Sequence, residues 1–253
     1  MTTQPVQRVL GVIPARIGST RVPRKMLKDL AGKTLIRRTY ERSVAAQKLD
    51  ALVVATDSDD IEREANSFGA RVIRWTSATK NGTEAAAEVT KLFTDFVPDI
   101  VVVIWGDGPL YPASVIDDSI ECMLTNTVCD AVVPSFKIDP AFVNDPSVGK
   151  VVTDNNNRIL YLSRSPIPYN KSGESVQYYS ATGALVIRRE LLEMYGSLPR
   201  EGLEAVEDVE QLRLIQRGYC VNTLKYDFEN REVNTPEDYE AILQLFRKRE
   251  GLI

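Results

Sequence analysis

The sequence contains no histidine, and this absence is its most informative compositional feature. It excludes a serine–histidine–aspartate triad, a cysteine–histidine pair, a histidine metal ligand and a histidine general base. Chemistry in this chain must therefore use carboxylates, lysine and arginine, hydroxyls, backbone amides or a hard metal ion.

Cysteines are few, and long apolar runs are missing. Cys122, Cys129 and Cys220 are odd in number, have no zinc-type spacing and lie in apolar stretches, so we interpret them as core residues in a reducing compartment. The longest apolar run, residues 100–105, is far too short to span a bilayer, and the N-terminus does not resemble a signal peptide. We therefore expect a cytoplasmic protein with no membrane partner.

An excess of positive charge is also missing. Lysine and arginine number 31 against 35 aspartates and glutamates, which gives a net charge of −4 and leaves no basic stripe for nucleic acid. With 253 residues, 43% of them hydrophobic, the chain can form a substantial core. We expect one domain over residues 1–253 and no nucleic-acid partner.

In the first half of the chain, short apolar runs alternate with segments of helical period. This alternation predicts a Rossmann-like α/β fold, a mostly parallel sheet flanked by helices. The predicted strands are 9–13, 52–56, 71–75, 100–105 and 131–136, and the predicted helices are 34–49, 59–68, one from Thr83 and one from Ser114.

The pattern changes after about residue 137. A β-rich insert is predicted at about 137–200, with a hairpin formed by 148–153 and 158–162 and a further strand at 183–187. Beyond it we expect helices at 206–216 and 236–248, on either side of a strand at 220–226.

The loop after the first predicted strand, residues 14–25, has the composition of a phosphate-binding loop. In an open parallel sheet, ligands bind beyond the carboxyl ends of the strands. A glycine lets the backbone approach a ligand, amides and hydroxyls donate to phosphate oxygens, and arginine forks match phosphate geometry. The residues concerned are Ala15, Arg16, Gly18, Ser19, Thr20, Arg21, Arg24 and Lys25.

This loop is neither a Walker A loop nor a GxGxxG turn. The alternative is a solvated basic loop, but cations this dense repel one another without an anion. We therefore interpret the loop as a polyphosphate site.

Two further motifs allow both a functional and an ordinary interpretation. Asp107, beside Gly106 at the end of the fourth predicted strand, could hold Mg²⁺ against phosphates or simply form a turn. Asn81, Gly82 and Thr83 precede a helix and could hold a nucleoside or only cap that helix.

Together these motifs resemble the cytidylyltransferases that activate sugar acids, and specifically the CMP-Kdo synthetase (3-deoxy-manno-octulosonate cytidylyltransferase) family. The resemblance covers nearly the whole chain and depends on the order and spacing of several weak motifs. They are the first loop and residues 54–57, 81–84, 106–110, 162–168, 210–213 and 234–238.

The resemblance implies transfer of CMP from CTP to the anomeric oxygen of a sugar acid, with release of pyrophosphate. It also implies Mg²⁺ as cofactor, a role in lipopolysaccharide biosynthesis, and a homodimer with the insert at its interface. The implied catalytic residues are Arg16, Lys25 and Asp107, with Asp107 and Asn234 as metal ligands. The implied nucleotide-binding residues are Ala15, Arg16, Gly18, Ser19, Thr20, Arg21, Lys25, Asn81, Gly82 and Thr83. The implied sugar-binding residues are Trp105, Arg164, Ala181, Leu185, Glu210 and Gln211.

Four positions depart from this family's usual residues. Trp105 replaces a glutamine, Ala181 a histidine and Leu185 a tyrosine, and Asn234 replaces a metal-binding aspartate. The first three remove hydrogen-bonding groups, which predicts a Kdo-like or modified Kdo acceptor; the fourth predicts weaker binding of a second Mg²⁺. Another acidic acceptor, such as a nonulosonate or a phosphonate, and a non-catalytic nucleotide-binding homologue stay open as alternatives.

Overall fold

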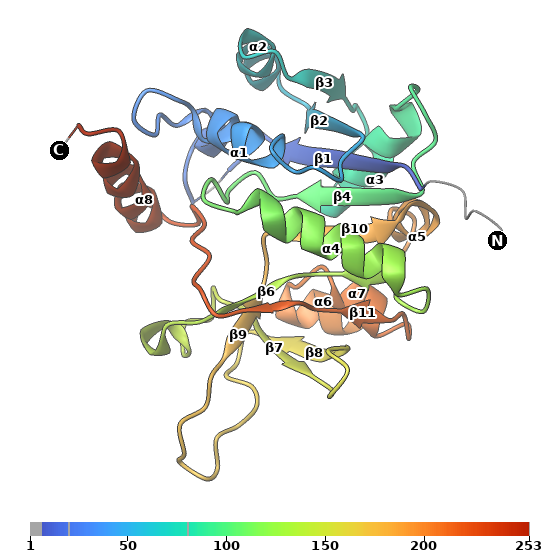
Figure 1. The fold of residues 1–253 in the computed structure, drawn as a ribbon, viewed down its shortest axis with the longest axis vertical. Helices are drawn as coiled ribbons and strands as arrows, with labels where there is room; N and C mark the ends of the chain where they lie inside the picture. Colours follow the sequence, from blue (N-terminus) through green and yellow to red (C-terminus); the bar gives the residue numbers. More distant parts are fainter. Residues whose placement is uncertain (1–6, 20, 80, 253) are drawn as a thin grey trace.

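A computed structural model describes residues 7–19, 21–79 and 81–252. Its centre is a seven-stranded sheet in the order β11-β5-β10-β4-β1-β2-β3 (Figure 1). All neighbouring strands are parallel except β10, which runs antiparallel to β4 and β5. The predicted α/β fold with a mostly parallel sheet is thus confirmed. The strands are β1 (Val9–Ala15), β2 (Ala51–Thr56), β3 (Arg71–Arg74), β4 (Ile100–Ile104), β5 (Ala131–Val132), β10 (Ala184–Arg188) and β11 (Val221–Asn222).

The central strands are buried on both faces, as expected for apolar runs without alternation. In β4, Val102 packs into the core cluster on one face, whereas Val101 and Val103 pack into the cluster on the other. Helices α1 (Leu35–Ser43), α2 (Asp59–Ser67), α4 (Ala113–Thr125) and α8 (Pro236–Arg249) contribute to the first cluster. Helices α3 (Gly82–Leu92) and α5 (Arg189–Tyr195) contribute to the second.

Local capping residues fix where two of these helices begin. The side chain of Asn81 accepts a hydrogen bond from the backbone N–H of Glu84 at 2.8 Å, so α3 starts at Gly82, one residue before the predicted Thr83. Thr235 and Asp238 form a reciprocal capping box at the start of α8. The predicted helix at 34–49 is too long, because α1 ends at Ser43.

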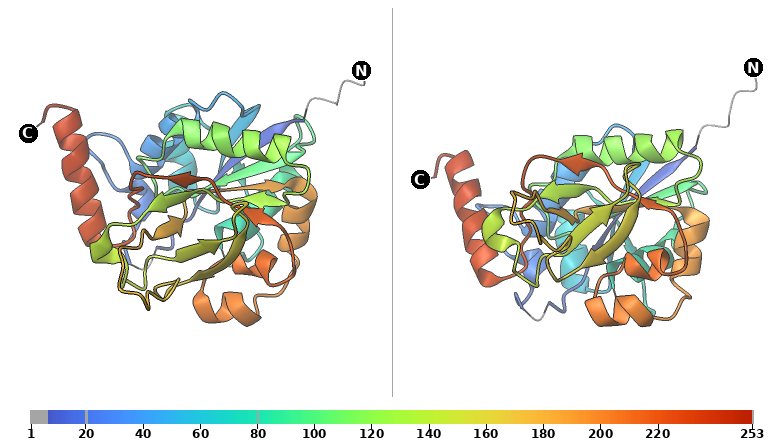
Figure 2. Two further views of the ribbon diagram at one scale, coloured as in Figure 1. Left: turned by 60° about the horizontal axis from the view of Figure 1, so that its bottom comes forward. Right: turned by 90° about the horizontal axis from the view of Figure 1, so that it is seen from below.

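The second half of the chain adds a small sheet and a hairpin at one end of the main sheet (Figures 1 and 2). The hairpin, β7 (Lys150–Thr153) with β8 (Ile159–Ser163), confirms the prediction. The small sheet has the order β12-β6-β9, from β6 (Ser135–Lys137), β9 (Tyr179–Ala181) and β12 (Lys225–Tyr226). The structure also contains two 3-10 helices, η1 (Lys25–Leu27) and η2 (Pro140–Phe142).

Three of the predicted elements after residue 130 are wrong in detail. The segment 131–136 is split into β5 and β6, which belong to different sheets; Pro134 lies between them and has no N–H for a ladder. The segment 220–226 is likewise divided, into β11 of the main sheet and β12 of the small one. The single helix predicted at 206–216 is instead α6 (Gly202–Glu207) and α7 (Leu212–Ile215), because Asp208 has a left-handed backbone with φ +53°.

One strand of the predicted insert belongs to the main sheet. β10 lies between β4 and β5 in that sheet, although its residues fall within the range 137–200. The description of this range as an insert in a single domain stays a prediction. Within the described ranges, no helix is both long and apolar enough to cross a bilayer.

Candidate active site

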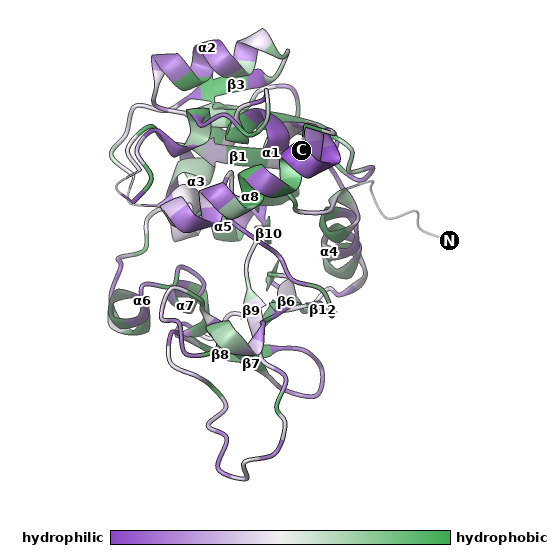
Figure 3. Ribbon diagram, turned by 90° about the vertical axis from the view of Figure 1, so that its left-hand side faces the viewer, coloured by the Kyte–Doolittle hydropathy of each residue, from purple (hydrophilic) through white to green (hydrophobic). Residues whose placement is uncertain are grey.

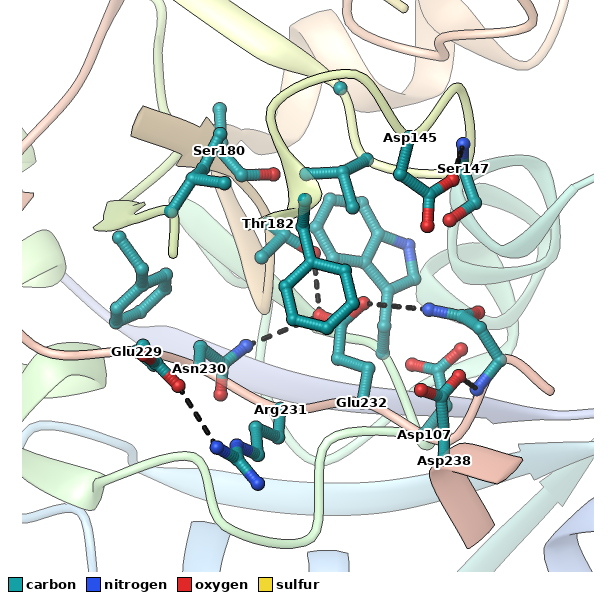
Figure 4. A pocket seen from close by; sticks show the side chains of 18 of the residues that line it. Asp107, Asp145, Ser147, Ser180, Thr182, Glu229, Asn230, Arg231, Glu232 and Asp238 are labelled. Carbon is teal, nitrogen blue, oxygen red and sulfur yellow. Dashed lines mark hydrogen bonds and ion pairs between the residues drawn. The ribbon is translucent and has the colours of Figure 1, made fainter. Parts of the chain in front are cut away.

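A cavity of about 460 Å³ lies beyond the carboxyl end of β4, between the main sheet and the small one (Figure 4). Figure 3 shows the hairpin of β7 and β8 at the far end of the molecule from α2 and β3. Five of the six predicted sugar-binding residues line it, and both predicted metal ligands do so as well. These residues are Trp105, Asp107, Arg164, Ala181, Glu210, Gln211 and Asn234.

Leu185 is the exception, and its assignment to the sugar pocket is wrong in this structure. Its side chain is 1% exposed and packs in the core cluster beneath α3 and α5. Alternate residues of β10 face opposite sides of the sheet. Leu185 therefore stabilises the fold and does not line the cavity.

Lys25 connects the first loop to the end of β4. Its Nζ donates to Asp107 Oδ2 at 3.0 Å and to the backbone carbonyl of Val233 at 2.9 Å. The backbone N–H of Val233 in turn donates to the carbonyl of Asp107 at 2.9 Å. Three distant segments thus meet at one cation whose side chain is only 12% exposed.

Arg16 brings the first loop against the loop before α3. Its Nη2 donates to Thr79 Oγ1 at 2.9 Å and to the carbonyl of Asn81 at 2.5 Å. Gly82 packs beside the ring of Pro14. The two segments that were predicted to bind nucleotide are therefore neighbours.

The other two arginines of the first loop, Arg21 and Arg24, are exposed. Arg24 forms an ion pair with Asp60 at 2.6 Å. Thr20 lies outside the described residues. A Cβ added to Gly18 would meet nothing within 4 Å, so the protein itself imposes no steric need for glycine there.

Two further residues of this loop, Ala15 and Ser19, are held by the structure of the protein itself. Ala15 is the last residue of β1 and is buried. The N–H of Ser19 donates to the carbonyl of Ile17 at 2.9 Å, so this amide is engaged within the loop. The predictions that Ala15, Gly18, Ser19 and Arg21 contact a nucleotide stay predictions.

Thr83 and Glu210 link the segment that is predicted to hold the nucleotide to a segment that is predicted to bind the sugar acid. The hydroxyl of Thr83 donates to Glu210 Oε2 at 2.5 Å. Burial raises the pKa of Glu210, and the hydrogen bonds from Thr83 offset part of that rise. Glu210 thus lies on the cavity wall with a neutral partner and no ion pair among the described residues.

Arg164 is held in place by backbone carbonyl groups. Its guanidinium donates to the carbonyls of Glu207 at 2.7 Å, Asp208 at 2.8 Å, Pro146 at 3.0 Å and Ser147 at 3.1 Å. These carbonyl groups orient the guanidinium, which also forms a long ion pair with Asp208 Oδ2 at 3.8 Å. The prediction that Arg164 binds a substrate carboxylate stays a prediction.

The residues around Asp107 fit a magnesium ion. Asp107 Oδ1 is buried and has no hydrogen-bond partner in the described structure, a costly state that a cation would relieve. Mg²⁺ commonly uses one or two carboxylates and completes its shell with phosphate oxygens and water. Among the described residues, no three or more acidic or cysteine side chains are placed so that they could hold a metal ion together.

Glu232, which was not among the predicted site residues, also lines the cavity. Its carboxylate accepts from the hydroxyl of Thr182, from Asn230 Nδ2 at 3.3 Å and from Asn234 Nδ2 at 3.5 Å (Figure 4). Burial, and then the negative charge of Asp107, raise the pKa of Glu232 to about 7. The feature of the sequence that could have indicated Glu232 is its position two residues before Asn234, a predicted metal ligand.

A profile of the cytidylyltransferase family matches residues 10–225. This chain belongs to the cytidylyltransferase family. It is 36% identical to the 3-deoxy-manno-octulosonate cytidylyltransferase of Solibacter usitatus over 95% of both chains. It is 38% identical to the mitochondrial 3-deoxy-manno-octulosonate cytidylyltransferase of Arabidopsis thaliana, over 96% of this chain and 84% of that relative.

A solved structure shows the same relationship in three dimensions. A CMP:2-keto-3-deoxy-manno-octonic acid synthetase complexed with CTP superposes with a TM-score of 0.89 at 31% identity, over 96% of this chain and 100% of the other. The resemblance to the CMP-Kdo synthetases that the motifs indicated is confirmed.

Proposed function

We propose that this protein is a CTP-dependent nucleotidyltransferase that transfers CMP to the anomeric oxygen of 3-deoxy-manno-octulosonate (Kdo) or a closely related acid and releases pyrophosphate. Relatives named for this activity match nearly the whole chain, and the similar solved structure holds CTP. The observation that carries the proposal is the contact between Lys25 and Asp107, which joins the cationic loop to a carboxylate on the cavity wall.

The side chains of this site act by positioning and by neutralising charge. Arg16 and Lys25 would stabilise the triphosphate and then the leaving pyrophosphate, with Arg21, Gly18 and Ser19 beside them. The segment 81–83 would hold the cytidine, and Thr20 belongs to the proposed loop although it lies outside the described residues. None of these roles needs a histidine, which agrees with the composition.

Asp107 would hold a Mg²⁺ ion, with Asn234 as a neutral oxygen ligand. When bound, this ion would supply positive charge against the phosphate oxygens. Lys25 already occupies Asp107 Oδ2, so the free Oδ1 is the atom available to the ion.

The cavity wall supports a modified Kdo as the second candidate acceptor. Arg164, Glu210 and Gln211 supply polar groups for an acidic sugar, whereas Trp105 and Ala181 offer no hydrogen-bonding group like those usual in the family. A pocket that lacks such partners discriminates less strongly in favour of a hydroxyl.

We further propose a cytoplasmic homodimer that serves lipopolysaccharide biosynthesis. The segment 137–200 carries exposed apolar side chains that support an interface: Phe142 is 53% exposed, Leu160 56% and Tyr169 85%. Light scattering of the purified protein would give twice the chain mass if the dimer forms, and one chain mass would contradict it.

Pyrophosphate release tests the proposed function directly. The purified protein is assayed with Mg²⁺, each of CTP, UTP, ATP and GTP, and a panel comprising Kdo, deoxy and amino derivatives of Kdo, a nonulosonate and a phosphonate. We expect release with CTP and a Kdo-type acid, and none with Asp107→Asn. Release only with the nonulosonate or phosphonate would favour those acceptors, and no release under any condition would favour the non-catalytic alternative.

A further inference from the structure

The part of the cavity around Asp107 contains a second carboxylate, that of Glu232. The hydrogen bond from Val233 N–H to the Asp107 carbonyl aligns the two segments. The Cγ of Glu232 lies 3.9 Å from the position that a Cβ on Gly108 would take, directly after Asp107. Figure 4 shows Asp107 and Glu232 in the same part of the cavity. The carboxylates of Asp107 and Glu232 therefore lie close to each other in the cavity.

The neighbouring acidic side chains already have other roles. Asp238 Oδ2 accepts from the backbone N–H groups of Asn234 at 3.0 Å and Thr235 at 2.8 Å, which fixes the start of α8. Glu229 forms an ion pair with Arg231 at 3.2 Å. Neither carboxylate is free to compensate a cation beside Asp107.

Glu232 differs from these neighbours because all its hydrogen-bond donors are neutral. They are the hydroxyl of Thr182 and the side-chain amides of Asn230 and Asn234. Among the residues that the structure describes, no lysine or arginine forms an ion pair with Glu232, although the charge of Lys25 acts on it from a greater distance. A partly buried carboxylate without a direct ion-pair partner is costly, and a bound cation would reduce that cost.

A divalent cation beside Asp107 would also need a second anionic group to balance its charge. Lys25 has already neutralised part of Asp107 through Oδ2, and the residue on the opposite segment, Asn234, carries no charge. Mg²⁺ sites in nucleotide-binding enzymes commonly use one or two carboxylates together with substrate phosphates.

We propose that Glu232 binds the divalent cation together with Asp107 and supplies the negative charge that Asn234 lacks. This inference rests on the proposed function, because the cation is the one that would accompany the nucleotide. Glu232 is then the residue that sets metal affinity in this chain, and Asn234 is a neutral ligand beside it.

Binding of Mn²⁺, followed by electron paramagnetic resonance without nucleotide, tests the inference independently of activity. The variants are Glu232→Gln, Asp107→Asn, the double variant Glu232→Gln with Asn234→Asp, and Glu240→Gln. The last removes an equal charge from an exposed position on α8 and serves as the control.

We expect Glu232→Gln to weaken Mn²⁺ binding about tenfold or more, within the range reported for residues that support metal sites. The double variant should recover most of this loss, because Asp at position 234 returns the missing charge, and Glu240→Gln should bind like the wild type. Recovery in the double variant also shows that Glu232→Gln leaves the fold intact. Gln has nearly the same shape as Glu and can still accept from Thr182.

The outcomes separate the inference from the proposed function. If Glu232→Gln binds Mn²⁺ like the wild type while Asp107→Asn does not, the inference is wrong and the proposed function stands. If Asp107→Asn also binds like the wild type, or the wild type binds no Mn²⁺, the magnesium site in the proposed function is wrong as well. Pyrophosphate release by the wild type, measured in parallel, decides whether the transferase activity itself survives.

Discussion

The hydroxyl of Thr83 donates to the carboxylate of Glu210 across 127 positions of the sequence. Thr83 belongs to the segment that is proposed to hold the nucleotide, and Glu210 lies on the cavity wall on the acceptor side. One hydrogen bond thus joins the two halves of the proposed site. A substitution of either residue should therefore affect both the nucleotide side and the acceptor side.

Replacing Thr83 by valine should destabilise the protein, because Glu210 loses its hydroxyl donor in a buried setting. The expected loss in the free energy of unfolding is about 1–3 kcal/mol. Urea denaturation measures it, with Thr125→Val as the control, since Thr125 is exposed and bonds only to carbonyls of its own helix. Equal losses in the two variants would show that the contact with Glu210 contributes no more to the free energy of unfolding than the contacts of an exposed threonine do.

Replacing Lys25 by methionine should lower kcat for pyrophosphate release by about 10²- to 10³-fold, because a cation aimed at developing phosphate charge is removed. The neighbouring Arg24 offers a matched control, since it points outward to Asp60 in an exposed pair. Arg24→Met should change kcat by no more than about threefold. Similar losses in both variants would mean that the general charge of the loop matters and the contact with Asp107 does not.

Replacing Asn234 by aspartate should lower the Mg²⁺ concentration needed for the half-maximal rate, because a charged ligand joins the proposed site. The measurement is a Mg²⁺ titration of pyrophosphate release at fixed CTP and acceptor. A titration curve that coincides with that of the wild type would remove position 234 from the metal site.

Replacing Arg213 by methionine should cost about 3–5 kcal/mol of unfolding free energy, because it leaves Glu204 buried and unpaired. Arg213 is fully buried and pairs with Glu204 at 2.5 Å and with Glu84 at 2.9 Å. It thereby ties α6 and α7, which flank Glu210, to the start of α3. Denaturant unfolding measures the cost.

Arg217→Met is the matched control for Arg213, because Arg217 pairs with the exposed Glu201 at 2.8 Å. A pair of this kind contributes about 1 kcal/mol or less. Comparable costs in the two variants would show that the buried network is not what holds α6 and α7.

The fluorescence of Trp105 should report ligand binding. The chain has two tryptophans, of which Trp105 lines the cavity and Trp75 is 3% exposed in the core. Titration with CTP or with a sugar acid should change the emission of the wild type and of Trp75→Phe, but not that of Trp105→Phe. A signal that persists in Trp105→Phe would place the ligand away from this wall.

The alternation of strands and helices, the cationic loop of residues 14–25 and the family could all be predicted from the amino-acid sequence. These features depend on residues that are close together in the sequence. A buried parallel strand is recognised from a short apolar run, and a helix cap from a side chain that lies three residues before the amide it binds. A family motif is likewise recognised from the order of residues along the chain. The structure confirms most of the predicted elements, but three of them are each divided into two and the first helix is shorter than predicted.

Features that depend on contacts between distant segments became apparent only in the folded chain. In the folded chain, β10 lies antiparallel in the main sheet, Leu185 packs in the core, and the helix predicted at 206–216 is interrupted at Asp208. Arg16 and Lys25 contact the segments around the cavity, whereas Arg24 forms an exposed pair with Asp60. Glu232 also lies beside Asp107. Strand order, side-chain direction and the meeting of charges follow from packing between segments far apart in the chain, which no local pattern records.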